Sequence, residues 1–231
     1  MNSHYTYFLI LLGCLAGPLA LSFDKKVAFY KKWKFAFPAM ILPAVFYIIW
    51  DSVFTRIGVW SFNEQYITGA RFFKLPVEEV LFFFIVPYCC LFIYECIRCY
   101  FPHLQNSIRS DTILQITGVT LLISGLIYHG RLYTATTFIL TALFIAVIFL
   151  FRKYFHTFRT TTFLASYGII LLPFMIVNGF LTAWPVVLYN NAENLSFRIY
   201  TIPFEDIFYG MLLIMMNIAA YEKRRNPESL R

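Results

Sequence analysis

Apolar residues occur along this chain in long blocks, separated by short polar connections. A helix of about twenty apolar residues is long enough to cross the roughly 30 Å hydrocarbon core of a bilayer. Few charged residues interrupt the blocks, so the pattern predicts membrane-spanning helices rather than the helices of a soluble domain. We expect seven spans, the fourth being the shortest, at residues 5–22, 34–54, 76–97, 112–128, 133–151, 161–181 and 203–221.

The overall composition is also typical of a membrane protein. Hydrophobic residues make up 60% of the 231 residues, and charged residues make up only 13%. An ordinary soluble domain has roughly 25% charged residues. The segment before the first block, Met1-Asn2-Ser3-His4, contains no Lys or Arg, and no convincing small-residue cleavage site follows the block. A secretory signal peptide has a basic N-terminal segment and a cleavage site of small residues. We therefore expect residues 5–22 to remain as a helix of the mature protein.

Lys and Arg residues lie mainly in alternate connections, and this distribution predicts the orientation. Cytoplasmic loops of membrane proteins carry an excess of these residues. We therefore expect the N-terminus outside and the C-terminus in the cytoplasm, in a bacterial cytoplasmic membrane. The net charge of +7 does not indicate nucleic acid binding, because the basic residues are not gathered on one soluble face. The residues expected on the cytoplasmic side are Lys25, Lys26, Lys31, Lys32, Lys34, Arg98, Arg109, Arg152, Lys153, Arg159, Lys223, Arg224, Arg225 and Arg231, against Arg56, Arg71, Lys74, Arg131 and Arg198 outside.

A polar motif occurs twice at a fixed distance along the chain. Pro76-Val77-Glu78-Glu79 returns 127 positions later as Pro203-Phe204-Glu205-Asp206, and each copy begins an apolar block. The same offset needs no gap between residues 51 and 95. It aligns Asp51 with Asn178, Asn63 with Asn190, Arg71 with Arg198, and Tyr94-Glu95 with Tyr221-Glu222.

This internal duplication predicts the fold. Three spans reverse the side of the membrane, so a directly fused second copy would be inverted, and the fourth span restores the side. We predict an all-α integral membrane protein with two parallel three-helix repeats, related by a pseudo-twofold axis along the membrane normal. Both acidic motifs then reach the same, non-cytoplasmic end and face each other. The expected boundaries are 1–98 for the first repeat, 99–131 for the linker helix and 132–231 for the second repeat.

The two acidic motifs are candidates for catalysis. Proline and acidic residues in the first turn also suit helix capping, but ionisable residues within membrane segments are costly and are functional by default. Burial among aromatic rings disfavours the charged form of a carboxyl group, so such an acid can donate a proton to an apolar substrate. Aromatic faces can stabilise the resulting cation. We expect Glu78 and Glu205 to act as acids, and Glu79 and Asp206 to hold the charged form or accept a proton.

Other polar residues leave alternatives open. Asp51 lies near the end of the second span, where its repeat equivalent is the neutral Asn178. It is either an additional base or acceptor in one half, or a polar helix end near the interface. Arg71 and Arg198 either pair with the motif carboxylates or anchor the interface. The acids at the cytoplasmic helix ends, Glu95 and Glu222, are expected to be solvated.

The outer connections before the two motifs, residues 55–75 and 182–202, contain several aromatic and amide residues. They suit either an interfacial belt or a lid over a lipid-facing cavity. Among the five cysteines, Cys96-x-x-Cys99 has no second pair or nearby histidine that would complete a site. We therefore expect reduced thiols packed as small apolar side chains. The four histidines lie in separate loops, and we expect neither a metal nor another cofactor.

The tandem P-x-E-[ED] motifs, each opening the third helix of a three-span repeat, resemble those of the lycopene cyclase domain family. Residues 112–128 correspond to the joining helix of its fused members. The resemblance implies cyclisation of the ψ ends of lycopene into β-ionone rings, through γ-carotene to β-carotene, as an isomerisation without metal or net redox change. It implies catalytic roles for the four motif acids, lycopene and the bilayer as partners, and other carotenoid-pathway enzymes as possible neighbours. Ring type, the number of ends cyclised and the number of sites stay open.

Two other classes share some of these features. Sugar transporters of the SWEET type have the same 3+1+3 plan, but they need a polar cavity at the midplane, and the spans here contain few Asn, Gln or Ser residues. Membrane prenyltransferases of the UbiA type bind Mg²⁺ and a diphosphate through two Asp-rich motifs. No D-x-x-x-D pair occurs in this sequence. Both classes are kept as alternatives to the cyclase.

Overall fold

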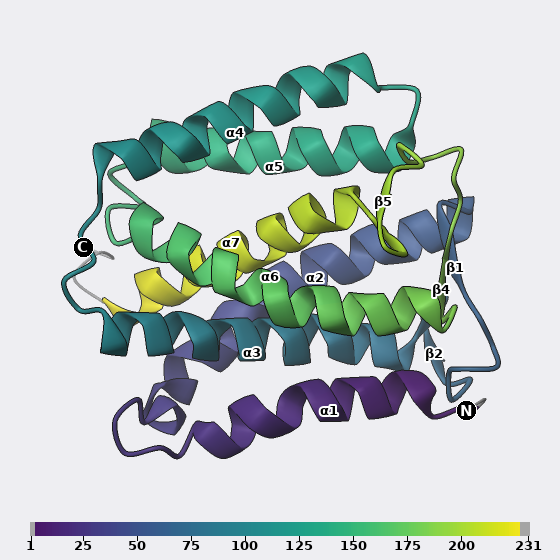
Figure 1. Ribbon diagram of the computed structural model, residues 1–231, viewed down its shortest axis with the longest axis horizontal. Coiled ribbons are helices and arrows are strands. Elements are labelled where there is room, and N and C mark those ends of the chain that lie inside the picture. The colour runs from purple at the N-terminus through teal and green to yellow at the C-terminus, as the bar shows by residue number, and fades with distance from the viewer. Residues whose placement is uncertain (1–2, 227–231) are drawn as a thin grey trace.

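Helices make up most of the protein in the computed structural model, which describes residues 3–226 (Figure 1). Each helix coincides with an expected span to within a few residues. The expectation that the fourth is the shortest was wrong, because α4 has 20 residues and α1 has 16. Met1, Asn2 and Arg231 lie outside the described residues. The helices are α1 (Thr6–Leu21), α2 (Trp33–Ile57), α3 (Val77–Tyr100), α4 (Ile108–Ile127), α5 (Leu132–Leu150), α6 (Thr160–Ala183) and α7 (Glu205–Arg225), with a 3-10 helix (Phe29–Lys32) before α2.

Five helices are long and apolar enough to cross a membrane, namely α2 with its 3-10 segment, α3, α4, α5 and α6. Helix α1 is apolar but shorter. Helix α7 has 21 residues and is apolar only in its centre, since it begins with Glu205 and Asp206 and ends with Lys223, Arg224 and Arg225. Five apolar helices of this length indicate a membrane protein.

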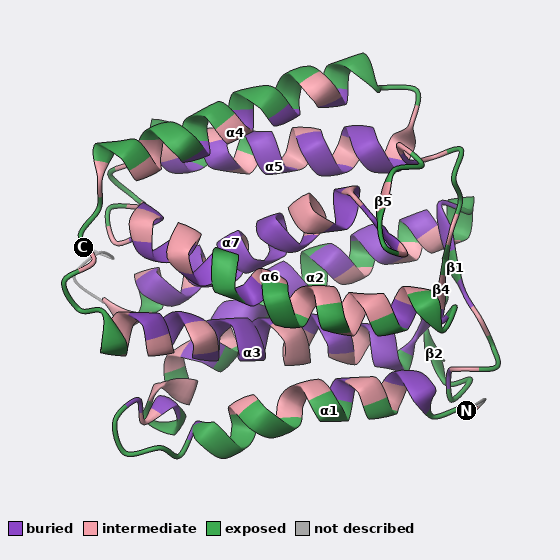
Figure 2. Ribbon diagram, viewed as in Figure 1, coloured by how far each residue is buried: buried purple, intermediate pink, exposed green. Residues whose placement is uncertain are grey.

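Helices α3 and α7 are the most buried of the bundle (Figure 2). Helices α1 and α2 pack against α3, and α5 and α6 pack against α7. Helix α2 also contacts α7, and α6 contacts α3, so the first three and the last three helices interlock. Helix α4 packs along α5 on the outside, and its exposed residues are largely Ile, Leu and Val, as a lipid-facing surface requires.

Two tight β-hairpins position the acidic residues at the starts of α3 and α7. Strand β2 (Arg71–Phe72) pairs with β3 (Leu75–Pro76), and β5 (Arg198–Ile199) pairs with β6 (Ile202–Pro203). The turn of the first hairpin has positive φ at Phe73 and Lys74, 46° and 76°, which is the backbone of turns that match the twist of antiparallel strands. Each hairpin ends at its motif proline, so its geometry fixes where the following acids begin.

A third pair of strands joins the two outer connections. Strand β1 (Trp60–Phe62) lies antiparallel to β4 (Val187–Tyr189), with Trp60 opposite Tyr189. The hydrogen bonds on either side are reciprocal: Asn63 N donates to Val186 O at 2.9 Å, and Asn190 N donates to Val59 O at 2.9 Å. The two connections therefore form one structure at the end of the bundle that also carries the acidic motifs (Figure 1).

The acids at the opposite end of α3 and α7 are buried, and the expectation that they are solvated was wrong. Glu95 and Glu222 are each 1% exposed. Tyr94 Oη donates to Glu222 Oε1 at 3.0 Å, and Tyr221 Oη donates to Glu95 Oε1 at 2.9 Å. Arg98 bridges the two carboxylates, at 3.1 Å from Glu95 and 2.7 Å from Glu222. This crossed network replaces water as the partner of both acids.

Candidate functional site

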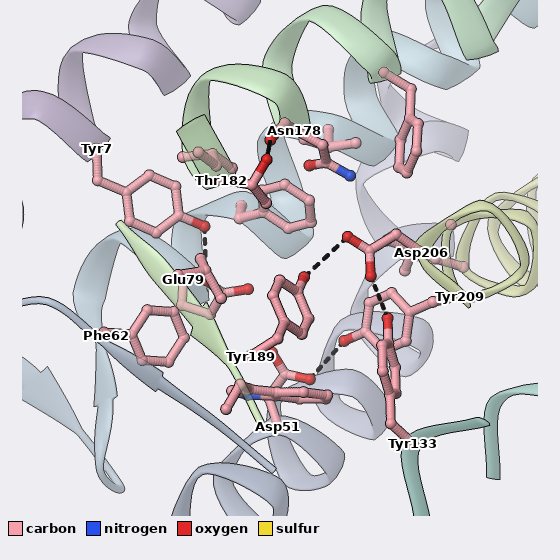
Figure 3. Close-up of a pocket in the computed structure, with 18 of the residues that line it drawn as sticks. Tyr7, Asp51, Phe62, Glu79, Tyr133, Asn178, Thr182, Tyr189, Asp206 and Tyr209 are labelled. Atoms are coloured by element: carbon pink, nitrogen blue, oxygen red, sulfur yellow. Dashed lines mark hydrogen bonds between the residues drawn. The ribbon is translucent and has the colours of Figure 1, made fainter. Parts of the chain in front are cut away.

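The acidic motifs meet in a cavity beside the β1–β4 pair (Figure 3). Residues of α1, α2, β1 and α3 in the first half line it, together with residues of α5, α6, β4 and α7 in the second half. Helix α4 contributes no residue. The polar residues of the lining are Tyr7, Asp51, Glu79, Tyr133, Asn178, Thr182, Tyr189, Asp206 and Tyr209.

The second acid of each motif faces this cavity, and a phenol holds each one. Tyr7 Oη donates to Glu79 Oε2 at 2.6 Å, and Tyr133 Oη donates to Asp206 Oδ1 at 2.5 Å (Figure 3). Asp206 accepts a second hydrogen bond from Tyr189 Oη at 2.9 Å. Glu79 is 7% exposed and Asp206 is 4% exposed. No lysine or arginine forms an ion pair with either acid within residues 3–226, so uncharged donors alone orient these carboxyl groups.

Asp51 is the third carboxyl group of the cavity. Tyr209 Oη donates to its Oδ1 atom (Figure 3). Asp51 and Glu79 line the same cavity, and their carboxyl groups interact electrostatically. Its repeat equivalent Asn178 lines the same cavity, and the equivalent of Tyr209 is Phe82, so both members of this pair differ between the halves. The two halves therefore contribute unequal chemistry to one shared space.

The first acids of the motifs point elsewhere, which corrects their expected position. Glu78 and Glu205 are buried but do not line the cavity. Glu78 Oε1 accepts the backbone N–H of Thr68 at 2.7 Å, and Glu205 Oε1 accepts that of Leu195, also at 2.7 Å. Thr134 Oγ1 donates to the same Glu205 oxygen at 2.5 Å. Adjacent residues of a helix point in directions about 100° apart, so the first acid of each motif points away from the cavity that the second acid lines. Through these hydrogen bonds the first acids hold the outer connections in place.

The outer connections cover the cavity, as the lid interpretation predicts. Trp60, Phe62, Val187 and Tyr189 of the β1–β4 pair all belong to its lining. The Trp60 and Tyr133 rings lie edge to face with centroids 5.2 Å apart. Burial raises the pKa of the Tyr189 phenol well above its ordinary value, and the neighbouring Asp206 carboxylate adds to the effect. Tyr189 is therefore a hydrogen-bond donor at any ordinary pH.

The two motif arginines do not bind the motif carboxylates. Arg71 Nη1 donates to Lys74 O at 2.7 Å and forms an ion pair with Glu64. Arg198 donates to Thr201 O and to Asn191 Oδ1, each at 2.8 Å. Because Lys74 and Thr201 lie in the hairpin turns, both arginines brace the hairpins that precede the motifs.

Potential metal-binding side chains are dispersed through the protein. Within residues 3–226, no group of three or more His, Cys, Asp or Glu side chains has a spacing suited to a metal ion. All five cysteines are free, and Cys89 and Cys90 are buried between helices. The Sγ atoms of Cys14 and Cys89 lie 3.9 Å apart.

Sequence reasoning missed the phenols that hold the carboxyl groups. Tyr7 and Tyr133 occupy equivalent places near the starts of α1 and α5, but they are separated by 126 positions rather than 127. The gap-free alignment began at residue 51 and did not extend to them. A search for aromatic residues near the start of the first helix in each half, α1 and α5, would have found Tyr7 and Tyr133.

The comparison with known proteins agrees with this arrangement. A family model described as lycopene cyclase matches residues 4–97 and again residues 130–223. A segment of 80 residues is 35% identical to the bifunctional lycopene cyclase/phytoene synthase of Leptosphaeria maculans, and covers 34% of this chain and 12% of that protein. The protein of the same description from Phaeosphaeria nodorum is 38% identical over 47 residues, which are 20% of this chain and 8% of that protein.

The matched segments thus span only a small part of these curated relatives, at most 12% of their length. No solved structure shows a significant match to the chain. The family model, in contrast, covers most of both halves, including each acidic motif and the tyrosines Tyr7 and Tyr133 that hold its second acid. On this coverage, the chain belongs to the lycopene cyclase family.

Proposed function

We propose that this protein is a lycopene β-cyclase, an isomerase that closes the ψ end groups of lycopene into β rings, through γ-carotene to β-carotene. The observation that carries the proposal is the shared cavity, in which three carboxyl groups receive hydrogen bonds from phenols and are surrounded by aromatic rings. Such a site can both give and take a proton next to an apolar substrate. Membership of the lycopene cyclase family supports the choice of substrate.

The proposed proton donor is the pair of carboxyl groups formed by Asp51 and Glu79. Two carboxyl groups that interact in one buried cavity resist ionising together, and we infer that one proton is shared between them. This proton adds to C2 of the terminal double bond and leaves a tertiary cation at C1. The C5=C6 electron pair then attacks C1, which closes the ring and moves the positive charge to C5.

The proposed base is Asp206. Two phenols donate to its carboxylate, and hydrogen bonds to the charged form of an acid favour that form. Asp206 takes the proton from C6, and the electrons of that C–H bond restore the C5=C6 double bond. One proton enters and one leaves for each ring, so the reaction is an isomerisation. Return of the proton to the Asp51–Glu79 pair completes the cycle.

The remaining residues of the site serve the cation and the acids. Trp60 and Tyr209 belong to the lining, and an aromatic ring stabilises a positive charge on a desolvated ligand by about 2 kcal/mol. The outer connections exclude water, which would otherwise trap the cation as an alcohol. Glu78 and Glu205 are assigned a positioning role, since each holds an outer connection by a backbone N–H.

The proposed arrangement in the membrane follows the sequence pattern. All seven helices cross the bilayer as two parallel three-helix repeats, with residues 1–98 and 132–231 as the repeats and 99–131 as the linker. The N-terminus lies outside and the C-terminus lies in the cytoplasm of a bacterial cell. The carboxylate cavity then opens near the outer face. Other carotenoid-pathway enzymes are the proposed neighbours of the protein in the membrane.

Pigment analysis of a lycopene-accumulating bacterial host that expresses this chain alone tests the proposal. Conversion to β-carotene is the expected result, and a monocyclic product would restrict the activity to one end. Unchanged lycopene, with the protein verified in the membrane, would contradict the proposal. Membranes incubated in D₂O test the mechanism separately, because a proton that exchanges with solvent adds one deuterium to each ring formed. Rings without deuterium would exclude an exchangeable acid as the donor.

A further inference from the structure

A second cavity adjoins the carboxylate cavity. It lies between α1, α3 and α6 and has a free volume of about 260 Å³. Phe82, Val86, Phe174 and Asn178 line both cavities, so their side chains form the junction between the two. We call this second cavity the α1/α6 groove. Gly13 lies in its α1 wall, and residues of α6 form the opposite wall.

The α1/α6 groove is open toward the side of the helix bundle. Gly13 is exposed, and Ile176 on the α6 wall is 61% exposed. Apart from Asn178 and the thiols of three cysteines, the lining consists of apolar side chains and Gly13. The exposed surface of the helices faces hydrocarbon in a membrane, so an apolar molecule can enter this groove from the bilayer without crossing water.

Volume distinguishes the roles of the two cavities. The free space beside the carboxyl groups is only about 50 Å³, whereas a cavity that binds benzene has a volume of roughly 150 Å³. The α1/α6 groove can therefore hold a segment of hydrocarbon as it stands. The carboxylate cavity can admit an end group only when side chains at the junction, such as Phe82 and Phe174, move aside.

The corresponding pair of residues in the other half is joined by a hydrogen bond. The offset of 127 residues pairs Asn178 with Asp51 and Phe82 with Tyr209. Tyr209 binds Asp51 through its hydroxyl group, but Phe82 has no hydroxyl group with which to bind Asn178. Phe82 and Asn178 at the groove can therefore separate. Their counterparts, Tyr209 and Asp51, are held together by a hydrogen bond and belong to the proposed catalytic site.

We propose that the α1/α6 groove is the subsite for the polyene chain of the substrate. A linear, unsaturated hydrocarbon enters sideways between α1 and α6, and its end group passes Phe82 and Phe174 to reach the carboxyl groups. Recognition depends on shape, because lipid tails are as apolar as the groove. The inference rests on the proposed cyclase function. Because this groove leads to one set of carboxyl groups, the two ends of a substrate molecule react one after the other. The molecule leaves the groove and binds again with its second end between the two reactions.

Substitution of Gly13 tests the groove by filling it. A Cβ atom added at Gly13 has no other atom within 4 Å, so Gly13→Leu extends into the groove without a clash and strengthens the helix. We expect conversion of lycopene to fall about tenfold or more, equivalent to about 1.4 kcal/mol, with an unchanged amount of protein in the membrane. Gly17→Leu is the matched control. Gly17 is equally free of contacts and lies one turn further along α1, but does not line the groove.

A second pair of variants probes the opposite wall. Ile176→Trp narrows the groove from α6, while Leu172→Trp places the same side chain on a residue that is 70% exposed and outside the lining. We expect loss of conversion only in Ile176→Trp, and this pair decides the matter if Gly13→Leu fails to accumulate. Normal conversion by Gly13→Leu and Ile176→Trp, or equal losses in their two controls, would overturn the groove proposal. An active wild-type protein would in that case still support the cyclase function. An inactive wild-type protein would instead reject the function on which the groove depends.

Discussion

Replacement of Asp51 by Asn is the sharpest test of the unequal halves of the site. The substitution keeps the shape of the side chain and its acceptor oxygen for Tyr209, but removes the carboxyl group that shares a proton with Glu79 in the proposed mechanism. It also makes the first half identical to the second at this position, since Asn178 is the equivalent residue. A merely structural polar contact would survive the change.

The expected loss follows from the role of the pair. General acid catalysis by a positioned group contributes about 10²–10⁴-fold to a rate, which corresponds to about 3–5 kcal/mol of activation free energy. Tyr209→Phe should be milder, because it removes one hydrogen bond to an acid, worth about 1.5–3 kcal/mol when the acid is charged. Asn178→Asp should bring no gain, since its neighbour is Phe82 rather than a tyrosine.

The assay is the initial rate of lycopene consumption in isolated membranes, divided by the amount of cyclase protein measured by immunoblot. The order of rates should be wild type, Tyr209→Phe and then Asp51→Asn. An Asp51→Asn protein that retains more than about one tenth of the wild-type rate would refute the proton-sharing pair, because the loss would lie below the range of general acid catalysis. Glu79 alone would then have to supply the proton.

Four further substitutions separate chemistry from structure. Glu79→Gln should lower the rate by about 10²-fold or more, whereas Glu78→Gln, whose amide oxygen can still accept a backbone N–H, should keep most of it; equal losses would contradict the assignment of the two acids. Glu95→Gln should lower the melting temperature of the purified protein, because loss of one partner of a buried ion pair costs about 3–5 kcal/mol; an unchanged melting temperature would show that the crossed network is not stabilising. Gly210→Ala should reduce conversion without loss of folded protein, since the new Cβ atom would lie 2.9 Å from the Phe174 ring at the junction; full activity would mean that the ring moves away freely.

The sequence was a good guide to whatever depends on long patterns. Hydrophobic blocks predicted the helices, and the repeated acidic motifs predicted that distant segments meet in one place. The choice between adjacent acids was beyond sequence reasoning, because Glu78 and Glu79 differ only by one step around a helix whose facing is set by its neighbours. The burial of Glu95 and Glu222 was equally hidden. A sequence pattern predicts that acids near a helix end are solvated. It does not show that Tyr221, Tyr94 and Arg98 pack against them in the folded protein.

The reciprocal pairing of the outer connections has a consequence for how the chain could be divided. Strand β1 and strand β4 have only three residues each, and each finds its ladder partner in the other half. Either half alone would expose an unpaired strand edge, which favours association with another chain. Severing the backbone in the connection between α3 and α4 would leave the β1–β4 ladder and the crossed Tyr–Glu contacts intact. Two co-expressed fragments should then assemble as a heterodimer, with the active site made at their interface.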